Sequence, residues 1–170
     1  MQVLSGNEDK TKELCLQIVG KQLLESCFIP RYERVIKYGG EWHKKKEVLF
    51  PGYLFFETKQ IDAVFLALKC VPKLTRILGT GQYIIPLSKQ EEEILKKLVN
   101  EEYLMEMSYG YSVGKQVHII DGPMRDLNGI LRKVDRHKRL ATVEVEMFGR
   151  RINIKMGLEV LGKYSETVST

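Results

Sequence analysis

The residue types that could do catalytic or metal chemistry in this 170-residue sequence are its histidines, aspartates and cysteines. The histidines are far apart and lack the spacing of a metal site. Three aspartates in the second half of the chain flank predicted turns, where a carboxylate accepts backbone hydrogen bonds. No pairing of a nucleophile with a base can be inferred, so the sequence predicts a protein that is not an enzyme and has no metal or cofactor. These residues are His43, His118, His137, Asp121, Asp126 and Asp135.

The cysteines do not indicate a disulfide framework or a zinc site. Cys15, Cys27 and Cys70 are an odd number, lie far apart and form no C-x-x-C pair. The sequence also has no apolar run of transmembrane length and no secretion signal. We therefore expect a protein of the reducing cytoplasm that does not contact a membrane.

The charge balance favours an anionic partner. The chain has 27 Lys and Arg against 22 Asp and Glu, which gives a formal charge of +5. Trp42 stands close to Lys44, Lys45 and Lys46, so an indole that could stack on a base lies beside three cations. The alternative is a flexible hairpin tip.

The elements that position these residues predict an α+β fold. Apolar residues at helical spacing predict a helix over 8–24, and strands over 31–38 and 41–49 are joined by a Gly39-Gly40 hairpin turn. Tyr53 to Phe56 reads as a central strand. Further helices are expected over 60–71 and, from the Ser88 cap with Glu91 behind it, through Val99.

The second half of the chain predicts a separate, smaller domain. Residues 100–112 show no regular spacing of apolar residues, so we expect them to form a linker. The linker would join a domain at 1–99 to a domain at 113–163, which is followed by a tail at 164–170. Short alternating segments at 116–120, 129–135, 140–147 and 150–155 are typical of a small antiparallel barrel.

Val113 to Met124, followed by Asn128-Gly129, resembles the KOW motif, which implies an SH3-like five-stranded β-barrel. In the first domain, Phe50-Pro51-Gly52-Tyr53-Leu54-Phe55, Pro72 to Gly79 and Ile85 to Ser88 resemble successive landmarks of the NusG N-terminal domain. With Glu146 to Arg150 in the barrel, the resemblance extends over nearly the whole chain. It implies an α/β sandwich, the NGN domain, followed by a KOW domain.

Lys73 and Arg76 stand where general NusG proteins tend to have glycine, so the chain resembles the operon-specific paralogues LoaP and RfaH more than the housekeeping factor. This implies an antitermination factor that suppresses pausing and termination at specific operons. A general NusG-like elongation factor is the alternative. A KOW-type ribosomal RNA-binding protein is a third possibility. The NusG-like landmarks before residue 100 weigh against it, because such a protein does not need a polymerase-binding domain.

The resemblance implies that the first domain binds the clamp helices of the largest subunit of RNA polymerase. Phe50, Tyr53 and Phe55 match family positions on the binding face, and aromatic anchors are typical of protein interfaces. Because strand side chains alternate, we favour Tyr53 and Phe55 as the interfacial pair. The alternative is that all three are core residues.

The resemblance also implies a nucleic-acid surface that binds an RNA hairpin or exposed DNA, with a solvated charged face as the alternative. The barrel would bind a ribosomal protein of the small subunit or the termination factor Rho through Met124 and Phe148, unless these two are barrel core. We expect a monomer. The expected nucleic-acid contacts are Lys10, Lys12, Lys69, Lys73 and Arg76, with Trp42, Lys44, Lys45 and Lys46 as a second patch.

Overall fold

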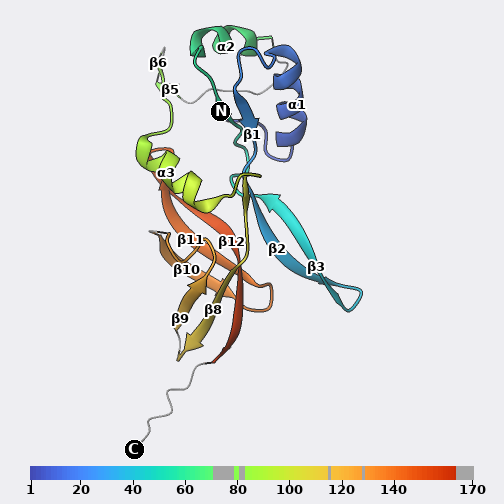
Figure 1. Ribbon diagram of the computed structural model, residues 1–170, viewed down its shortest axis with the longest axis vertical. Helices are drawn as coiled ribbons and strands as arrows, with labels where there is room; N and C mark the ends of the chain where they lie inside the picture. The colour runs from blue at the N-terminus through green and yellow to red at the C-terminus, as the bar shows by residue number, and fades with distance from the viewer. Residues whose placement is uncertain (71–78, 81–82, 115, 128, 164–170) are drawn as a thin grey trace, which may run out of the picture. The chain divides into compact units, whose positions relative to one another are not determined.

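The computed structural model describes residues 1–70, 79–80, 83–114, 116–127 and 129–163 (Figure 1). It mixes helices with sheets, as predicted. The chain divides into two compact units: unit 1 is Met1–Pro30 with Phe50–Leu87, and unit 2 is Arg31–Leu49 with Ser88–Thr170. Contacts within a fold do not decide which segments fold alone, so the domain limits at 1–99 and 113–163 stay a prediction.

Unit 1 contains α1 (Glu8–Ile18), α2 (Ile61–Leu68) and short strands. Strand β1 (Ser26–Phe28) pairs antiparallel with β4 (Phe55–Glu57), and β5 (Gly79–Thr80) pairs with β6 (Tyr83–Ile84). Helix α1 is shorter than predicted because Gly20, with φ of 78°, follows its C-cap. The core includes Cys15, Leu24, Phe28, Leu54, Val64 and Leu68.

Unit 2 begins with the predicted hairpin, which extends as a long two-stranded arm (Figure 1). Strands β2 (Arg31–Tyr38) and β3 (Glu41–Val48) pair antiparallel along their whole length. Gly39 and Gly40 have φ of 60° and 88°, the positive values that the tightest hairpin turns require. At its base, β2 also pairs in parallel with β7 (Leu104–Met105).

The remaining strands of unit 2 form a curled five-stranded sheet, as the SH3-like KOW resemblance implies. They are β8 (Ser108–Val113), β9 (Gln116–Asp121), β10 (Ile130–Asp135), β11 (Leu140–Met147) and β12 (Arg150–Lys163). Their order is β10-β11-β12-β8-β9, which leaves β10 and β9 at the two ends. Alternate residues of β11 and β12 are buried and belong to the core, namely Ala141, Val143, Val145, Met147, Ile154, Met156 and Leu158.

The range expected to be a linker, 100–112, contains β7 and most of β8. Strand β8 alternates regularly, but its buried positions are the small residues Ser108, Gly110 and Ser112, so no hydrophobic period shows in the sequence. Gly110 permits a close approach to β9, because a Cβ there would lie 2.6 Å from the carbonyl oxygen of His118.

Helix α3 (Lys89–Leu98) begins with the predicted capping box. The backbone N–H of Glu91 donates to Ser88 Oγ at 3.2 Å, and Glu91 Oε2 accepts the N–H of Ser88 at 2.8 Å. The other oxygen of Glu91 accepts the N–H of Gly149 at 3.1 Å, which ties α3 to the turn between β11 and β12. In the part of the chain that the structure describes, no helix is long and apolar enough to cross a membrane.

Candidate functional site

The aromatic segment of unit 1 forms a cluster in which two of the three predicted anchors are buried. Phe50 is 2% exposed and Phe55 6% exposed, and their ring centroids lie 5.6 Å apart. Phe55 also stacks on Phe28 at 5.6 Å. The structure therefore places Phe50 and Phe55 in the core and keeps only Tyr53 half-exposed.

The predicted alternation was wrong for a physical reason. The strand was expected to run from Tyr53 to Phe56, but β4 begins at Phe55, and Leu54 before it is fully buried. Tyr53 follows a turn in which Gly52 has φ of 81°. Side chains alternate only within a strand, so alternation does not place Tyr53 on the same face as Phe55.

The turn before Tyr53 is held by a buried carboxylate. Glu8, only 4% exposed, accepts hydrogen bonds from the N–H groups of Gly6 and Gly52, both at 2.8 Å. The N-terminal segment adds backbone bonds on the same side, from the N–H of Val3 to Gly52 and from the N–H of Leu54 to Met1, both at 2.9 Å. Tyr53 therefore stands on a fixed backbone, as an interface anchor requires.

The predicted cationic surface of unit 1 is described in part. Lys10 and Lys69 are exposed and Lys12 is half-buried, on helices α1 and α2 or just beyond them. The ammonium of Lys69 lies 5.0 Å from the ring centre of Phe65, a cation–π contact. The predicted residues Lys73 and Arg76 lie outside the described residues.

The hairpin patch is exposed, but its charges are paired. Lys44 lies 3.0 Å from Glu33, Lys45 3.3 Å from Glu47 and Lys46 3.8 Å from Glu102. The guanidinium of Arg139 sits 3.7 Å over the ring of Trp42 and occupies a face on which a base would stack. Such surface pairs are weak, yet they reduce the field that a phosphate would meet. All four residues predicted for this patch are thus engaged within unit 2.

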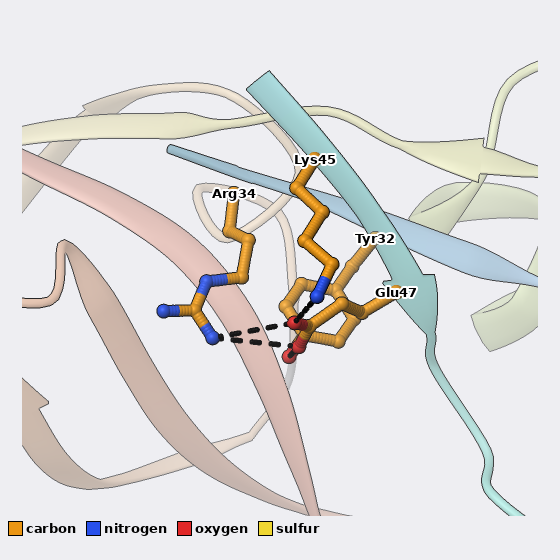
Figure 2. A network of polar contacts seen from close by, with 4 residues as sticks. All are labelled: Tyr32, Arg34, Lys45 and Glu47. Atoms are coloured by element: carbon orange, nitrogen blue, oxygen red, sulfur yellow. Dashed lines mark hydrogen bonds and ion pairs between the residues drawn. The ribbon is translucent and has the colours of Figure 1, made fainter. Parts of the chain in front are cut away.

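Figure 2 shows a network of polar contacts on the hairpin, in which Tyr32, Arg34 and Lys45 converge on Glu47. The hydroxyl of Tyr32 donates to Glu47 at 2.6 Å, and the guanidinium of Arg34 lies 3.4 Å from the same oxygen. Burial raises the pKa of Glu47, but the Tyr32 hydrogen bond and the two cations outweigh it and hold that pKa below its usual value. Burial and then the hydrogen bond to Glu47 raise the pKa of Tyr32.

The two residues predicted to bind a partner through the barrel differ in exposure. Met124 is buried, and its N–H donates to Ser108 Oγ at 3.1 Å, so Met124 belongs to the core of unit 2. Phe148 is half-buried and takes a φ of 58° in the turn between β11 and β12. Phe148 is therefore the more accessible of the two.

Sequence reasoning missed one cationic surface, which lies at the ends of the curled sheet. Arg132, Lys133 and Arg136 gather there with His118. The three cations are close in sequence, but only the curl of the sheet brings β10 near β9. No group of three or more His, Cys, Asp or Glu side chains that could hold a metal occurs among the described residues.

Comparisons with known proteins agree with this architecture. The family model "NusG: Transcription termination factor nusG" matches residues 1–96. The transcription termination/antitermination protein NusG of Haemophilus influenzae is 29% identical over 162 residues, covering 92% of this chain and 88% of the relative. The protein of the same name from Buchnera aphidicola is 27% identical over 172 residues, covering 96% and 93%.

A solved structure is also similar. The structure titled "Domain interaction in Thermotoga maritima NusG" superposes with a TM-score of 0.55 at 27% sequence identity, covering 91% of this chain and 89% of that one. The match thus includes both the α/β part and the curled sheet. Because the family model matches more than half of the 170 residues, the chain belongs to the NusG family.

Proposed function

We propose that this chain is a transcription elongation factor that binds RNA polymerase and acts as a processive antiterminator at specific operons. The family membership supports the general role, since the similar curated proteins are named transcription termination/antitermination proteins. The factor acts by binding, as a monomer in the cytoplasm, and carries out no catalysis.

The observation that carries the polymerase-binding part is the position of Tyr53. It is half-exposed beside buried Phe50 and Phe55, on a turn that Glu8 fixes, within the residues that match the family. A rigid aromatic ring that stands on a packed core is the kind of anchor that dominates interface affinity. We propose that Tyr53 contacts the clamp helices of the largest polymerase subunit.

Recruitment by an RNA hairpin is the second part of the proposal. Lys10, Lys12 and Lys69 supply cations from unit 1, and the sequence adds Lys73 and Arg76 where general NusG proteins tend to have glycine. Cations at these positions would hold phosphates, and an arginine can also read a base. This is the feature that favours a specialised factor of the LoaP or RfaH type.

A housekeeping elongation factor is the second candidate, because the similar curated proteins are NusG proteins themselves. In that case the barrel would bind Rho or a small-subunit ribosomal protein, with half-buried Phe148 as the contact.

A pull-down of polymerase by the tagged chain, with and without a transcribed leader hairpin, separates the specialised factor from the housekeeping one. Hairpin-dependent capture supports the specialised factor, and capture that ignores the hairpin supports the housekeeping one.

A further inference from the structure

The curled sheet of unit 2 ends in two strand edges that border a groove. Within the described ranges, β9 and β10 do not pair with each other, and a groove of about 480 Å³ lies along these strands. Residues of both strands line it, including Val117 and His118 from β9 and Leu131 and Lys133 from β10. Successive residues of β10 line the groove, so it follows the strand edge and not one face of the sheet.

The groove is positively charged. Arg132, Lys133 and Arg136 line it, and none of the described residues that line it carries a carboxylate. Glu144 neutralises Arg132 through hydrogen bonds of 2.9 and 3.1 Å. In the part of the chain that the structure describes, neither Lys133 nor Arg136 forms an ion pair.

Asp135 is the carboxylate nearest in sequence to these two cations, and it is already engaged. Its Oδ1 accepts the N–H of Lys138 at 2.9 Å, and its Oδ2 lies 3.9 Å from the ammonium of the same lysine. The hydrogen bond from the Lys138 backbone holds the pKa of Asp135 below its usual value, with a smaller effect from the charges of Lys138 and Lys133. Lys133 and Arg136 therefore keep their charge available to a ligand.

An aromatic surface lies beside the cations. The ring of His118 stacks on that of Tyr111, with centroids 5.6 Å apart and planes at 14°. His118 is exposed and lines the groove, while Tyr111 is half-buried, so an exposed aromatic ring supported by a second ring borders the groove. Leu131, 38% exposed, adds an apolar wall.

We infer that this groove binds single-stranded nucleic acid, with phosphates on Lys133 and Arg136 and a base stacked on His118. Cations that track a backbone beside an aromatic ring are the combination that binds single strands, and stacking on a side chain requires an unpaired base. An acidic peptide would use the same cations but has no need of the ring pair. The inference does not depend on the proposed polymerase binding.

The test measures fluorescence anisotropy of the full chain with labelled single-stranded RNA, single-stranded DNA of the same sequence, duplex RNA and an acidic peptide, at several salt concentrations. We expect either single strand to bind more tightly than the duplex or the peptide. Lys133→Gln with Arg136→Gln should weaken single-strand binding about tenfold and reduce the salt slope by about 0.7 for each lost contact. His118→Ala should weaken binding about fivefold or more, without changing that slope.

The matched control is Lys89→Gln with Lys155→Gln, which removes the same charge at two exposed residues outside the groove. It should bind like the wild type, and circular dichroism confirms that each variant is folded. Wild-type affinity and slope in Lys133→Gln with Arg136→Gln would overturn the inference. The inference would also be overturned if the duplex or the peptide bound more tightly than the single strands and if Lys133→Gln with Arg136→Gln removed that binding.

Discussion

The carboxylate of Glu8 and the backbone N–H of Gly52 form a hydrogen bond of 2.8 Å between residues 44 positions apart. The other oxygen of Glu8 accepts the N–H of Gly6 at the same distance. The start of α1 and the turn before Tyr53 are thus joined through one buried side chain. The placement of the proposed polymerase anchor depends on a residue that is not itself exposed.

Replacing Glu8 by alanine should destabilise unit 1. The N–H groups of Gly6 and Gly52 would lose their acceptor, and a buried unsatisfied donor costs about 1–3 kcal/mol. Urea unfolding followed by circular dichroism measures the loss. Glu8→Gln keeps one carbonyl acceptor, so its stability should lie between those of the wild type and Glu8→Ala. Equal midpoints for all three proteins would contradict this role of Glu8.

Tyr53→Ala and Phe55→Ala should have opposite effects. Tyr53→Ala should leave the melting temperature nearly unchanged and weaken polymerase binding by about 2 kcal/mol or more, the size of an interface hot spot. Phe55→Ala should cost about 3–5 kcal/mol of stability, because a buried ring is lost. Polymerase pull-down and thermal unfolding separate the two, with Tyr53→Phe as the conservative control. A large loss of stability in Tyr53→Ala would place Tyr53 in the core.

The Glu47 network should make stability depend on acid pH. The pKa of Glu47 is lowered in the folded protein, so its contribution is present above the unfolded glutamate value of about 4.3 and is lost as pH falls through the folded value. Unfolding of the wild type should therefore become easier as pH drops below about 4. Glu47→Gln should be less stable at pH 7 and lose part of this acid dependence. An unchanged pH profile would show that the network contributes nothing measurable.

The cations at Lys73 and Arg76 should govern hairpin binding. Lys73→Gly with Arg76→Gly restores the pattern of general NusG proteins and should weaken binding of an RNA hairpin, flattening the salt dependence by about one unit of slope for each phosphate contact. Polymerase binding should not change. Titration of labelled hairpins at several salt concentrations measures both quantities. Equal affinities and slopes would exclude this surface.

Much of the fold follows from local patterns. The turn at Gly39-Gly40 and the cap at Ser88 lie where predicted, because their residue types meet a local backbone requirement. The sequence did not predict strand β8, since its buried positions are small or polar. The predicted exposure of Phe55 was wrong because the Gly52 turn delays the start of β4. These features depend on neighbouring strands and could not be read from spacing.

The candidate site was less predictable for a similar reason. Sequence alone marked Trp42 and the lysines near it as a nucleic-acid patch. It could not show that carboxylates pair with the lysines or that Arg139 lies over the Trp42 ring. Conversely, the sequence predicted no binding role for Lys133, in the expected strand at 129–135, or for Arg136 directly after it. The curl of the sheet places them beside His118.

The most direct test of the central claim is read-through of an intrinsic terminator by purified RNA polymerase, on templates with and without a transcribed leader hairpin. The account predicts that the chain raises read-through when the hairpin is present, and that Tyr53→Ala abolishes this effect while remaining folded. Read-through that is unchanged by the chain, or equal on both templates, would contradict a specialised antiterminator recruited by RNA.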